Sequence, residues 1–276
     1  MIMLKSKSLN IINKDGLVYV SFPNMERAGV TAAFTTRLGG MSRGQYASMN
    51  MSFTNGDSKE SVTKNYEILL SALGLDYKKA VLSHQTHTDN IRIITEEDIG
   101  KGIVIKRDYE NVDGLITNLK GVTLVTQYAD CVPLLFFDPE RRVVATSHAG
   151  WRGTVKEIGL KTVLKMKEAF GCLPQNIIAA IGPSIDMCCY EVDDPVIDQI
   201  KALNYLEQSK VFFPKGSGKY QLNLKEANRQ ILTYAGIKNE NICVSDLCTC
   251  CHSEIFHSHR ATAGKRGNLA AVIALK

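Results

Sequence analysis

The sequence contains no long apolar run, no internal repeat and no low-complexity tract. Its longest apolar stretches, such as residues 269–275, have the length of a strand, whereas a membrane-spanning helix needs about 20 apolar residues. No Pro-, Gly- or Ser-rich linker divides the chain. These absences argue against repeat and membrane-spanning architectures and predict a single domain over residues 1–276. The first 16 residues lack the apolar core of a secretory signal, so we expect a cytoplasmic protein.

The chain also lacks a strong excess of charge of either sign. Lys and Arg number 33 against 28 Asp and Glu, which gives a formal net charge of +5. This mild balance favours anionic small molecules and gives no argument for nucleic acid. A content of 45% hydrophobic and 22% charged residues excludes intrinsic disorder and small disulfide scaffolds. We therefore expect a monomer or homodimer that acts on small molecules, with no nucleic-acid or membrane partner.

Short apolar runs and amphipathic stretches alternate irregularly along the chain. The apolar runs predict strands at residues 31–37, 80–83, 114–117, 122–128, 132–137, 143–147, 177–181, 242–245 and 269–275. Helical spacing and capping residues predict helices at about residues 58–73, 154–170, 194–203 and 223–235. Several connections between strands are too short for a crossover helix. The pattern predicts an α+β fold with mixed sheets rather than a Rossmann or barrel fold.

Three segments with histidine or cysteine stand at the ends of predicted strands: SHQTHTD, YADCVPLL and SHAGWRG. They contain His84, His87, Asp130, Cys131 and His148. In a cytoplasmic chain cysteines stay reduced, so metal binding or thiol chemistry is favoured over disulfides. A His, a Cys and a second His suit Zn²⁺, and three protein ligands leave the fourth tetrahedral position open for water or substrate.

Residue types alone leave two other interpretations of these segments open. Each could be an ordinary buried cysteine or a hydrogen-bonded histidine near a turn. Cys131 with His87 or His148 could also form a thiolate–imidazole couple, in which Asp113 or Asp130 orients the imidazole. Zinc ligation and nucleophilic catalysis use the same residue types, so the sequence does not separate them.

The C-terminal segment CTCCHSEIFHSHR concentrates further cysteines and histidines. Its members are Cys248, Cys250, Cys251, His252, His257 and His259. A structural zinc site is one interpretation. Taken as the run C-x-C-C-H, the segment lacks the C-x₂₋₄-C separation that lets two thiolates reach one ion. We therefore predict a wall of the substrate pocket here and one metal ion per chain.

Basic side chains beside predicted strand ends indicate an anion site. The Gly-rich turn TTRLGGMSRG is not a P-loop, because it lacks G-x-x-x-x-G-K-[ST]. Arg152 follows the HAGW turn at a predicted helix N-terminus, where backbone N–H groups favour an anion. Trp151 could stack on a flat ring. The basic candidates are Arg37, Arg43, Arg152, Arg260, Lys265 and Arg266.

Several of these segments, in this order, resemble the laccase-domain family, whose members are known as polyphenol oxidases and as purine nucleoside phosphorylases. The matching runs are FTTRLGGMSRGQYASMN, HQTHTDNI, VDGLIT, YADCVPLLFFD, SHAGWRG, IGPSI with CCYEV, SDLCT and FHSHR. They cover residues 34 to 272, and residues 1 to about 30 form the variable N-terminal segment. The resemblance implies an α+β fold of two mixed sheets packed face to face with helices on the outside, in α/β/β/α layers.

The resemblance also implies a metal site and a chemistry. Zinc, or copper as the alternative, would bind to His87, Cys131 and His148. The implied reactions are phosphorolysis of adenosine, inosine and methylthioadenosine, and deamination of adenosine, with polyphenol oxidation as a side activity of copper. In our interpretation, Asp113 or Asp130 moves the proton during deamination. The candidates for binding substrate or phosphate are Arg37, Asn50, Gln85, Arg152 and Arg260.

The tail departs from the family pattern. Ala261 and Asn268 stand where the family commonly has arginine, which weakens the case for anion contacts from this segment. A structural likeness of the family to cysteine-dependent deamidase toxins keeps the Cys–His interpretation open, and two functions other than a nucleoside enzyme are alternatives. One is an amide hydrolase with Cys131 as nucleophile, and the other is a non-catalytic protein that binds a nucleotide or a cell-wall fragment.

Overall fold

Two six-stranded mixed sheets form the frame of the molecule, a computed structural model that describes residues 4–276. In strand order, the first sheet consists of β1 (Asn10–Lys14), β2 (Leu17–Ser21), β3 (Thr31–Thr35), β15 (Leu269–Ala274), β7 (Thr123–Tyr128) and β4 (Ala80–Leu82). The second consists of β14 (Ile242–Val244), β10 (Ile178–Ile181), β8 (Val132–Asp138), β9 (Val143–Ala149), β6 (Gly114–Thr117) and β5 (Ile91–Ile93). Each sheet combines parallel and antiparallel pairs, as predicted.

The two sheets pack face to face over a shared apolar core. Strand β15 shows how the sequence achieves this, because alternate side chains of a strand point to opposite faces. Leu269, Ala271 and Ile273 belong to the core between the sheets, whereas Ala270 and Val272 belong to the core on the outer face of the first sheet. All five are fully buried, so the strand is apolar on both faces.

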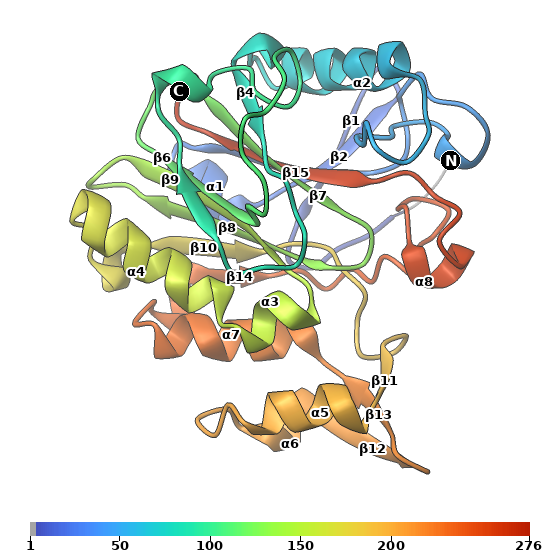
Figure 1. Cartoon of the computed structure of the whole chain (residues 1–276), viewed down its shortest axis with the longest axis vertical. Helices are drawn as coiled ribbons and strands as arrows, with labels where there is room; N and C mark the ends of the chain where they lie inside the picture. The colour runs from blue at the N-terminus through green and yellow to red at the C-terminus, as the bar shows by residue number, and fades with distance from the viewer. Residues whose placement is uncertain (1–3) are drawn as a thin grey trace.

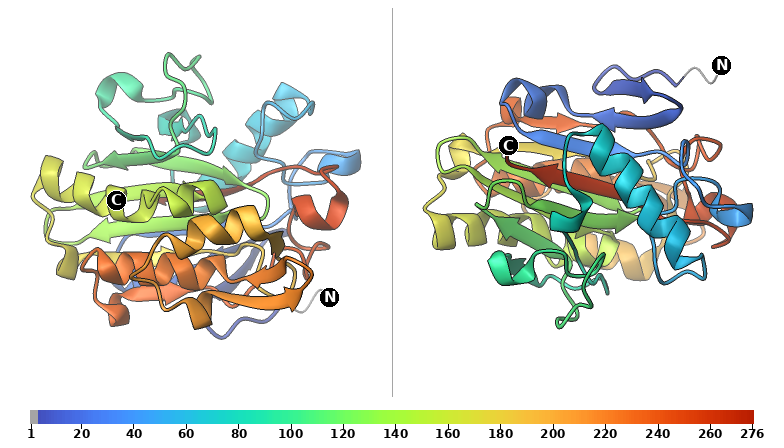
Figure 2. Two further views of the ribbon diagram at one scale, coloured as in Figure 1. Left: turned by 60° about the horizontal axis from the view of Figure 1, so that its bottom comes forward. Right: turned by 90° about the horizontal axis from the view of Figure 1, so that it is seen from above.

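Helices cover the outer face of each sheet and complete the four layers (Figures 1 and 2). Helix α2 (Lys59–Ala72) packs on the first sheet through side chains that include Tyr66 and Leu69. Ser58 caps it by accepting a hydrogen bond from the Ser61 N–H. Helices α3 (Trp151–Val155), α4 (Ile158–Phe170) and α7 (Leu224–Tyr234) cover the second sheet. The predicted α/β/β/α arrangement is therefore confirmed.

The predicted helix at residues 154–170 is in fact two helices. It starts earlier than expected, at Trp151, and it breaks at Glu157, whose φ of 59° lies in the left-handed region. The break separates α3 from α4 and leaves Trp151 and Arg152 in the first turn of a short helix. Both residues line the cavity described below.

Several small elements were not predicted from the sequence. The hairpin β1–β2 extends the first sheet, and β11 (Glu191–Asp193), β13 (Lys219–Leu222) and β12 (Phe212–Gly216) form a separate three-stranded sheet in that order. The predicted helix at residues 194–203 is α5 (Asp194–Lys201). The helices that were not predicted are α1 (Pro23–Arg27), α6 (Gln208–Val211) and α8 (His259–Thr262), with 3₁₀ turns at Gly44–Tyr46, Tyr77–Lys79, Glu96–Asp98, Pro174–Asn176 and Asn239–Asn241. Among residues 4–276, none of the helices has both the length and the apolar character that a membrane crossing requires.

Candidate metal centre and substrate cavity

Three potential metal ligands meet where strands of the two sheets end. His87 lies in the turn after β4, Cys131 lies between β7 and β8, and His148 lies near the end of β9. One ligand atom of each residue lies within 4.8 Å of the other two. The β8–β9 ladder pairs Val132 with Ala149, which brings Cys131 and His148 to neighbouring positions. The structure thus brings together the three residues that the sequence proposed as ligands.

Asp113 fixes the positions of two of these three residues, His148 and His87. It is fully buried just before β6, and its Oδ1 lies 2.8 Å from His148 Nδ1. It also accepts hydrogen bonds from the backbone N–H groups of Thr86, His87 and Thr88 at 2.9–3.1 Å. One carboxylate therefore orients the His148 ring and fixes the turn that carries His87. Such carboxylate–histidine contacts typically set the ring orientation of a metal-binding histidine.

The charges of the group favour a thiolate at neutral pH. Burial raises the pKa of the Cys131 thiol, but the charge and hydrogen bonds of His148 and His87 outweigh burial and lower it to about 6. Burial lowers the pKa of His148, whereas Cys131 and Asp113 raise it, to about 9. Burial raises the pKa of Asp113, but His148 and the turn N–H groups lower it to about 2. A thiolate is the form of cysteine that binds metal.

Gly150 permits the close approach of the three potential ligands. A Cβ atom at this position would lie 2.9 Å from Cys131 Sγ and 3.2 Å from His87 Cδ2. No side chain fits there unless the sulfur or the ring moves. This explains physically why the HAGW turn carries glycine directly beside the cluster.

A cavity of about 640 Å³ opens over the three residues. Its volume lies within the usual range for small-molecule sites. Aromatic faces from Phe53, Trp151 and Tyr190 contribute to its wall. Arg152 and Arg266 also line it and give it positive charge. The cavity can therefore accommodate a flat ring together with an anionic group.

Three of the five proposed substrate-binding residues line this cavity: Gln85, Arg152 and Arg260. The Arg152 guanidinium lies 4.3 Å from the centroid of the Trp151 ring. Arg260 donates hydrogen bonds to the carbonyls of Cys189 and Glu191 at 3.2 and 3.1 Å, which fixes the position of its side chain. Gln85 is held by the Gln127 backbone, because its Oε1 accepts from Gln127 N and its Nε2 donates to Gln127 O.

The other two proposed substrate-binding residues, Arg37 and Asn50, lie outside the cavity lining. Arg37 donates from Nε to Ala47 O at 2.9 Å and from Nη1 to Ser253 O at 3.0 Å, so its guanidinium ties the Gly-rich turn to the tail. Asn50 is fully buried and accepts a hydrogen bond from Asn268 N at 2.8 Å. The geometry therefore gives both residues a scaffolding position and does not support the predicted contact with phosphate.

The proton-transfer role predicted for Asp113 or Asp130 also disagrees with the geometry. Asp113 lies outside the cavity lining, beneath the ligands. Asp130 reaches the lining, but its oxygens accept from Thr249 Oγ1 at 2.6 Å, Ser258 Oγ at 3.0 Å and Arg260 N at 2.7 Å. Both carboxylates are occupied by protein donors, which suits them to positioning rather than to moving a proton.

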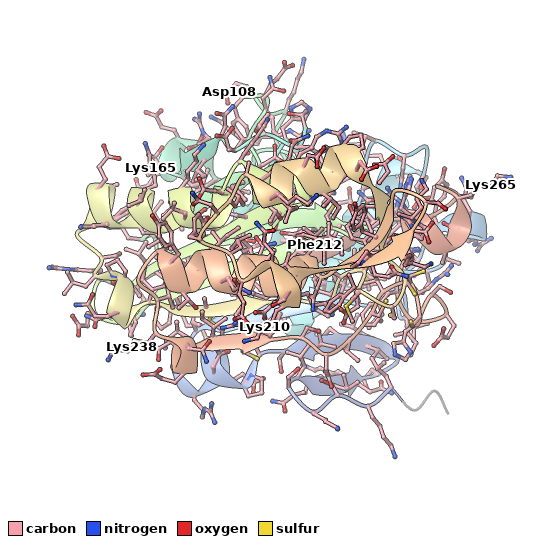
Figure 3. All side chains as sticks on the ribbon, turned by 90° about the horizontal axis from the view of Figure 1, so that it is seen from below. Asp108, Lys165, Lys210, Phe212, Lys238 and Lys265 are labelled. Carbon is pink, nitrogen blue, oxygen red and sulfur yellow. The ribbon has the colours of Figure 1, made fainter. Side chains whose placement is uncertain are left out.

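The tail contributes more residues to the cavity lining than the sequence analysis predicted. His259, Arg266 and Asn268 line the cavity together with Arg260. Lys265 points away from the body of the molecule (Figure 3) and lies outside the lining. Arg266 thus retains positive charge beside the site although Asn268 replaces an arginine of the family pattern. Tyr190, which lies in the quoted CCYEV run, was also missed, and that run was the available signal.

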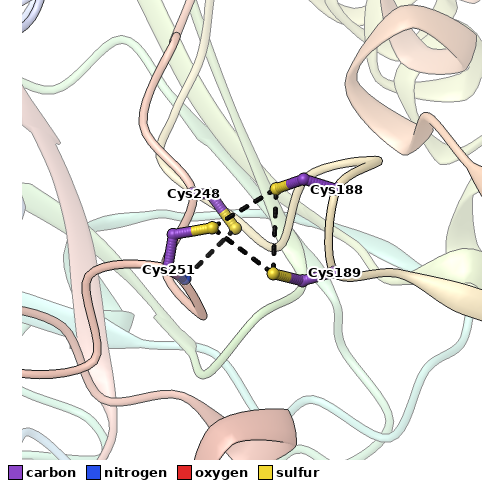
Figure 4. A group of neighbouring side chains, drawn as sticks. All are labelled: Cys188, Cys189, Cys248 and Cys251. Atoms are coloured by element: carbon purple, nitrogen blue, oxygen red, sulfur yellow. Dashed lines mark hydrogen bonds between the residues drawn. The ribbon is translucent and has the colours of Figure 1, made fainter.

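The spacing argument against a metal ion in the cysteine-rich tail was wrong. Cys248 and Cys251 are themselves separated by two residues, which the reading as C-x-C-C-H overlooked. The structure places both beside Cys188 and Cys189, and the four sulfurs lie within 4.8 Å of one another (Figure 4). The histidines of the tail are not members of this group.

Comparisons with known proteins agree with this geometry. The model of the family described as multi-copper polyphenol oxidoreductase laccase matches residues 31–276. The chain belongs to this family. Family membership confirms the resemblance carried by the HQTHTDNI, YADCVPLLFFD and SHAGWRG runs.

Members of the family with high similarity to this chain bear enzyme names. The chain is 40% identical over 257 residues to purine nucleoside phosphorylase YlmD of Bacillus subtilis (strain 168), covering 92% of this chain and 91% of that protein. It is 35% identical over 236 residues to adenosine deaminase RL5 of an unknown prokaryotic organism, covering 84% and 88%. The crystal structure of the Bacillus licheniformis hypothetical protein YfiH matches with a TM-score of 0.91 at 37% identity, covering 98% of this chain and 100% of that one.

Proposed function

We propose that this chain is a metal-dependent purine nucleoside enzyme. It would cleave adenosine, inosine and methylthioadenosine with phosphate, giving the free base and ribose 1-phosphate, and it would deaminate adenosine. The observation that carries the proposal is the convergence of His87, Cys131 and His148 at a cavity of about 640 Å³. The names of the family members described above support the choice of substrate.

The donor set fits the metal that the proposal requires. Two imidazoles and one thiolate are preferred ligands of zinc, and the lowered pKa of Cys131 favours the ligating form. The group also leaves one side open, because His87 is exposed and faces the cavity. A zinc ion bound there would supply Lewis-acid activation of water or of a substrate oxygen.

The chain's own residues account for substrate binding. In phosphorolysis a phosphate oxygen attacks the anomeric carbon while the bond to the base breaks, so the enzyme must hold an anion against the sugar. Arg152 supplies a guanidinium group that matches phosphate geometry, and Arg260, whose two Nη groups also donate to the carbonyls of Cys189 and Glu191, adds positive charge. Trp151 and Tyr190 offer flat faces for the purine ring. Electrostatic stabilisation by the arginines would favour the transition state.

One observation favours a second candidate, a cysteine-dependent amide hydrolase. Cys131, His148 and Asp113 form a chain of thiolate, imidazole and carboxylate, with 2.8 Å between His148 Nδ1 and Asp113 Oδ1. The same order of groups activates a nucleophile in thiol enzymes. The two candidates differ in their response to metal removal. Stripping the metal should abolish nucleoside turnover, whereas it should expose an active thiol in the hydrolase.

Oxidation of polyphenols by copper remains a side activity in this proposal. Residues 4–276 contain two groups with metal-ligand geometry. One is His87, Cys131 and His148, and the other consists of four cysteines. Reduction of O₂ by four electrons requires several copper centres, and one His–Cys–His group does not supply them.

The test follows the products formed from adenosine, with and without phosphate. Adenine that appears only with phosphate reports phosphorolysis, and inosine that appears without it reports deamination. Cys131→Ala should abolish both products, and Cys243→Ala, which alters a half-buried thiol outside the cavity lining, should abolish neither. If Cys131→Ala retained wild-type turnover of adenosine, the proposed function would be wrong.

A further inference from the structure

A second cluster of cysteines lies beside the cavity and has no role in the proposed reaction. Cys188 and Cys189 lie in the loop between β10 and β11, and Cys248 and Cys251 lie in the loop after β14. The Cys251 sulfur is 3.4 Å from each of the sulfurs of Cys188 and Cys189, which are 3.7 Å from one another. All four sulfurs point toward a common centre (Figure 4).

The separations among the sulfurs of Cys188, Cys189 and Cys251 are close to those of a four-thiolate metal site. Thiolates placed tetrahedrally at about 2.3 Å from a zinc ion are about 3.8 Å from one another. The observed separations of 3.4–3.7 Å approach this value. They are much longer than the bond of about 2.05 Å that joins the sulfurs of a disulfide. The cluster is therefore close to the size at which one ion fits between its members.

The local backbone also suits a metal-binding turn. Cys248 and Cys251 have the C-x₂-C spacing that lets two thiolates of one turn reach one ion. Two backbone N–H groups point at the Cys248 sulfur, those of Asp186 at 3.3 Å and Cys251 at 3.5 Å. Such donors stabilise the negative charge of a metal-bound thiolate.

Protein contacts also hold the two loops of the cluster together. Ser184 pairs with Cys248 in a β-bridge, and Thr249 N donates to Ser184 O at 3.0 Å. The buried Lys225 side chain joins the loops a second time, because its Nζ donates to Asp186 Oδ2 and to Leu247 O, each at 2.8 Å.

We propose that Cys188, Cys189, Cys248 and Cys251 bind one Zn²⁺ in a closed structural site, separate from the group of His87, Cys131 and His148. Four protein thiolates fill the tetrahedron, so the ion has no open position for substrate. This site replaces the prediction of one metal ion per chain by two. It does not depend on the reaction proposed above, because no cysteine of the cluster lines the cavity.

The position of the cluster gives the ion a consequence for the cavity. The loop of Cys188 and Cys189 carries Ile185 and Tyr190 into the lining, and the carbonyl of Cys189 accepts a hydrogen bond from Arg260. The loop of Cys248 reaches the site through Thr249, whose hydroxyl donates to Asp130 at 2.6 Å. The structural ion would therefore hold together the two loops that form one wall of the cavity.

The experiment counts zinc per chain in full-length protein purified without air and without added metal. We expect two equivalents in the wild type and one in Cys131→Ala. Cys251→Ser should hold one equivalent, and the matched control Cys250→Ser, which alters the thiol next to the cluster, should hold two. A Cys251→Ser variant with the same zinc content as Cys250→Ser would overturn the proposal.

X-ray absorption at the zinc edge of Cys131→Ala keeps the proposal testable if Cys251→Ser does not fold. The ion that remains should have four sulfur neighbours at about 2.3 Å and no nitrogen neighbour. Zinc-free Cys131→Ala, nitrogen ligands in the remaining site, or a disulfide among the four cysteines in the anaerobic protein would each refute it. If the His–Cys–His site binds no metal, the wild type and Cys131→Ala would both hold one equivalent of zinc. This result would refute the proposed function without refuting the four-cysteine site.

Discussion

Replacing Asp113 by asparagine would remove a buried negative charge from beneath the ligands while keeping the shape of the side chain. The two carboxylate oxygens accept from His148 Nδ1 at 2.8 Å and from the turn that carries His87 at 2.9–3.1 Å. An amide has one acceptor oxygen, so either the ring or the turn would face an NH₂ group instead. Asp113→Asn therefore tests whether this residue positions the ligands.

The size of the effect follows from the pKa of Asp113, which is about 2 instead of the ordinary 3.8. A carboxyl group whose pKa falls on folding stabilises the protein above its unfolded pKa, and that contribution is lost as the pH falls toward 2. At about 1.4 kcal/mol per pKa unit, the ionised group contributes about 2 kcal/mol at pH 7. Asparagine lacks this contribution at every pH, so the difference between wild type and variant should shrink below pH 4.

Two assays measure this prediction. Urea unfolding of metal-stripped protein should show Asp113→Asn to be less stable by about 2 kcal/mol at pH 7. Competition with a chromophoric chelator should show zinc affinity at the His–Cys–His site weakened about 10- to 100-fold. Asp108→Asn, which alters an exposed carboxylate paired with Lys101, should change neither quantity. Unchanged zinc affinity in Asp113→Asn would refute the positioning role.

The remaining predictions concern the ligands and the anion. Gly150→Ala should lower the zinc content of the His–Cys–His site, because the added Cβ would lie 2.9 Å from Cys131 Sγ. A variant whose His–Cys–His site binds as much zinc as that of the wild type would contradict this close packing. Arg152→Ala should raise the KM for phosphate more than the KM for adenosine in deamination, and equal losses of both reactions would count against a phosphate contact. Arg37→Ala should lower the thermal stability and leave the phosphate KM unchanged. In metal-stripped protein, alkylation of Cys131 measured by mass spectrometry should be half-maximal near pH 6, and a midpoint near the ordinary thiol value of 9 would disprove the thiolate–imidazolium pair.

Local signals were enough to predict the main elements of the fold. Helix α7 spans Leu224–Tyr234 with caps at Asn223 and Ala235, which are the limits that the sequence predicted. Capping residues and apolar spacing act within a few residues, so they can be recognised without the rest of the chain. The break at Glu157 was not predictable in this way, because its left-handed backbone has no glycine to signal it.

The convergence of the site depends on contacts that no local pattern contains. His87 and His148 are 61 positions apart in the numbering. His87 follows β4 of the first sheet and His148 lies near the end of β9 of the second, and they meet because those sheets pack face to face. Periodicity identified the strands but not their order, so the ligand set rested on the family resemblance. The cysteine cluster was missed for the same reason. Cys188 and Cys189 come from a loop about 60 residues before Cys248, and only the fold brings the two loops together.

Arg37 shows the opposite case, in which a chemically suitable residue makes other contacts. A basic side chain beside a Gly-rich turn fits an anion site by composition. In the structure Arg37 lies outside the cavity lining, and its Nε and Nη1 donate to the carbonyls of Ala47 and Ser253. Hydrogen bonding to backbone carbonyls requires the same N–H groups as binding phosphate, and the sequence does not show which of the two partners an arginine will have.

The most direct test of the central claim is a zinc titration of metal-stripped protein during turnover of inosine with phosphate. Stripped protein should release no hypoxanthine, and release should return as zinc binds to His87, Cys131 and His148. Cys131→Ala should show no recovery at any zinc concentration. Full hypoxanthine release by stripped protein, or recovery in Cys131→Ala, would contradict a metal-dependent nucleoside enzyme.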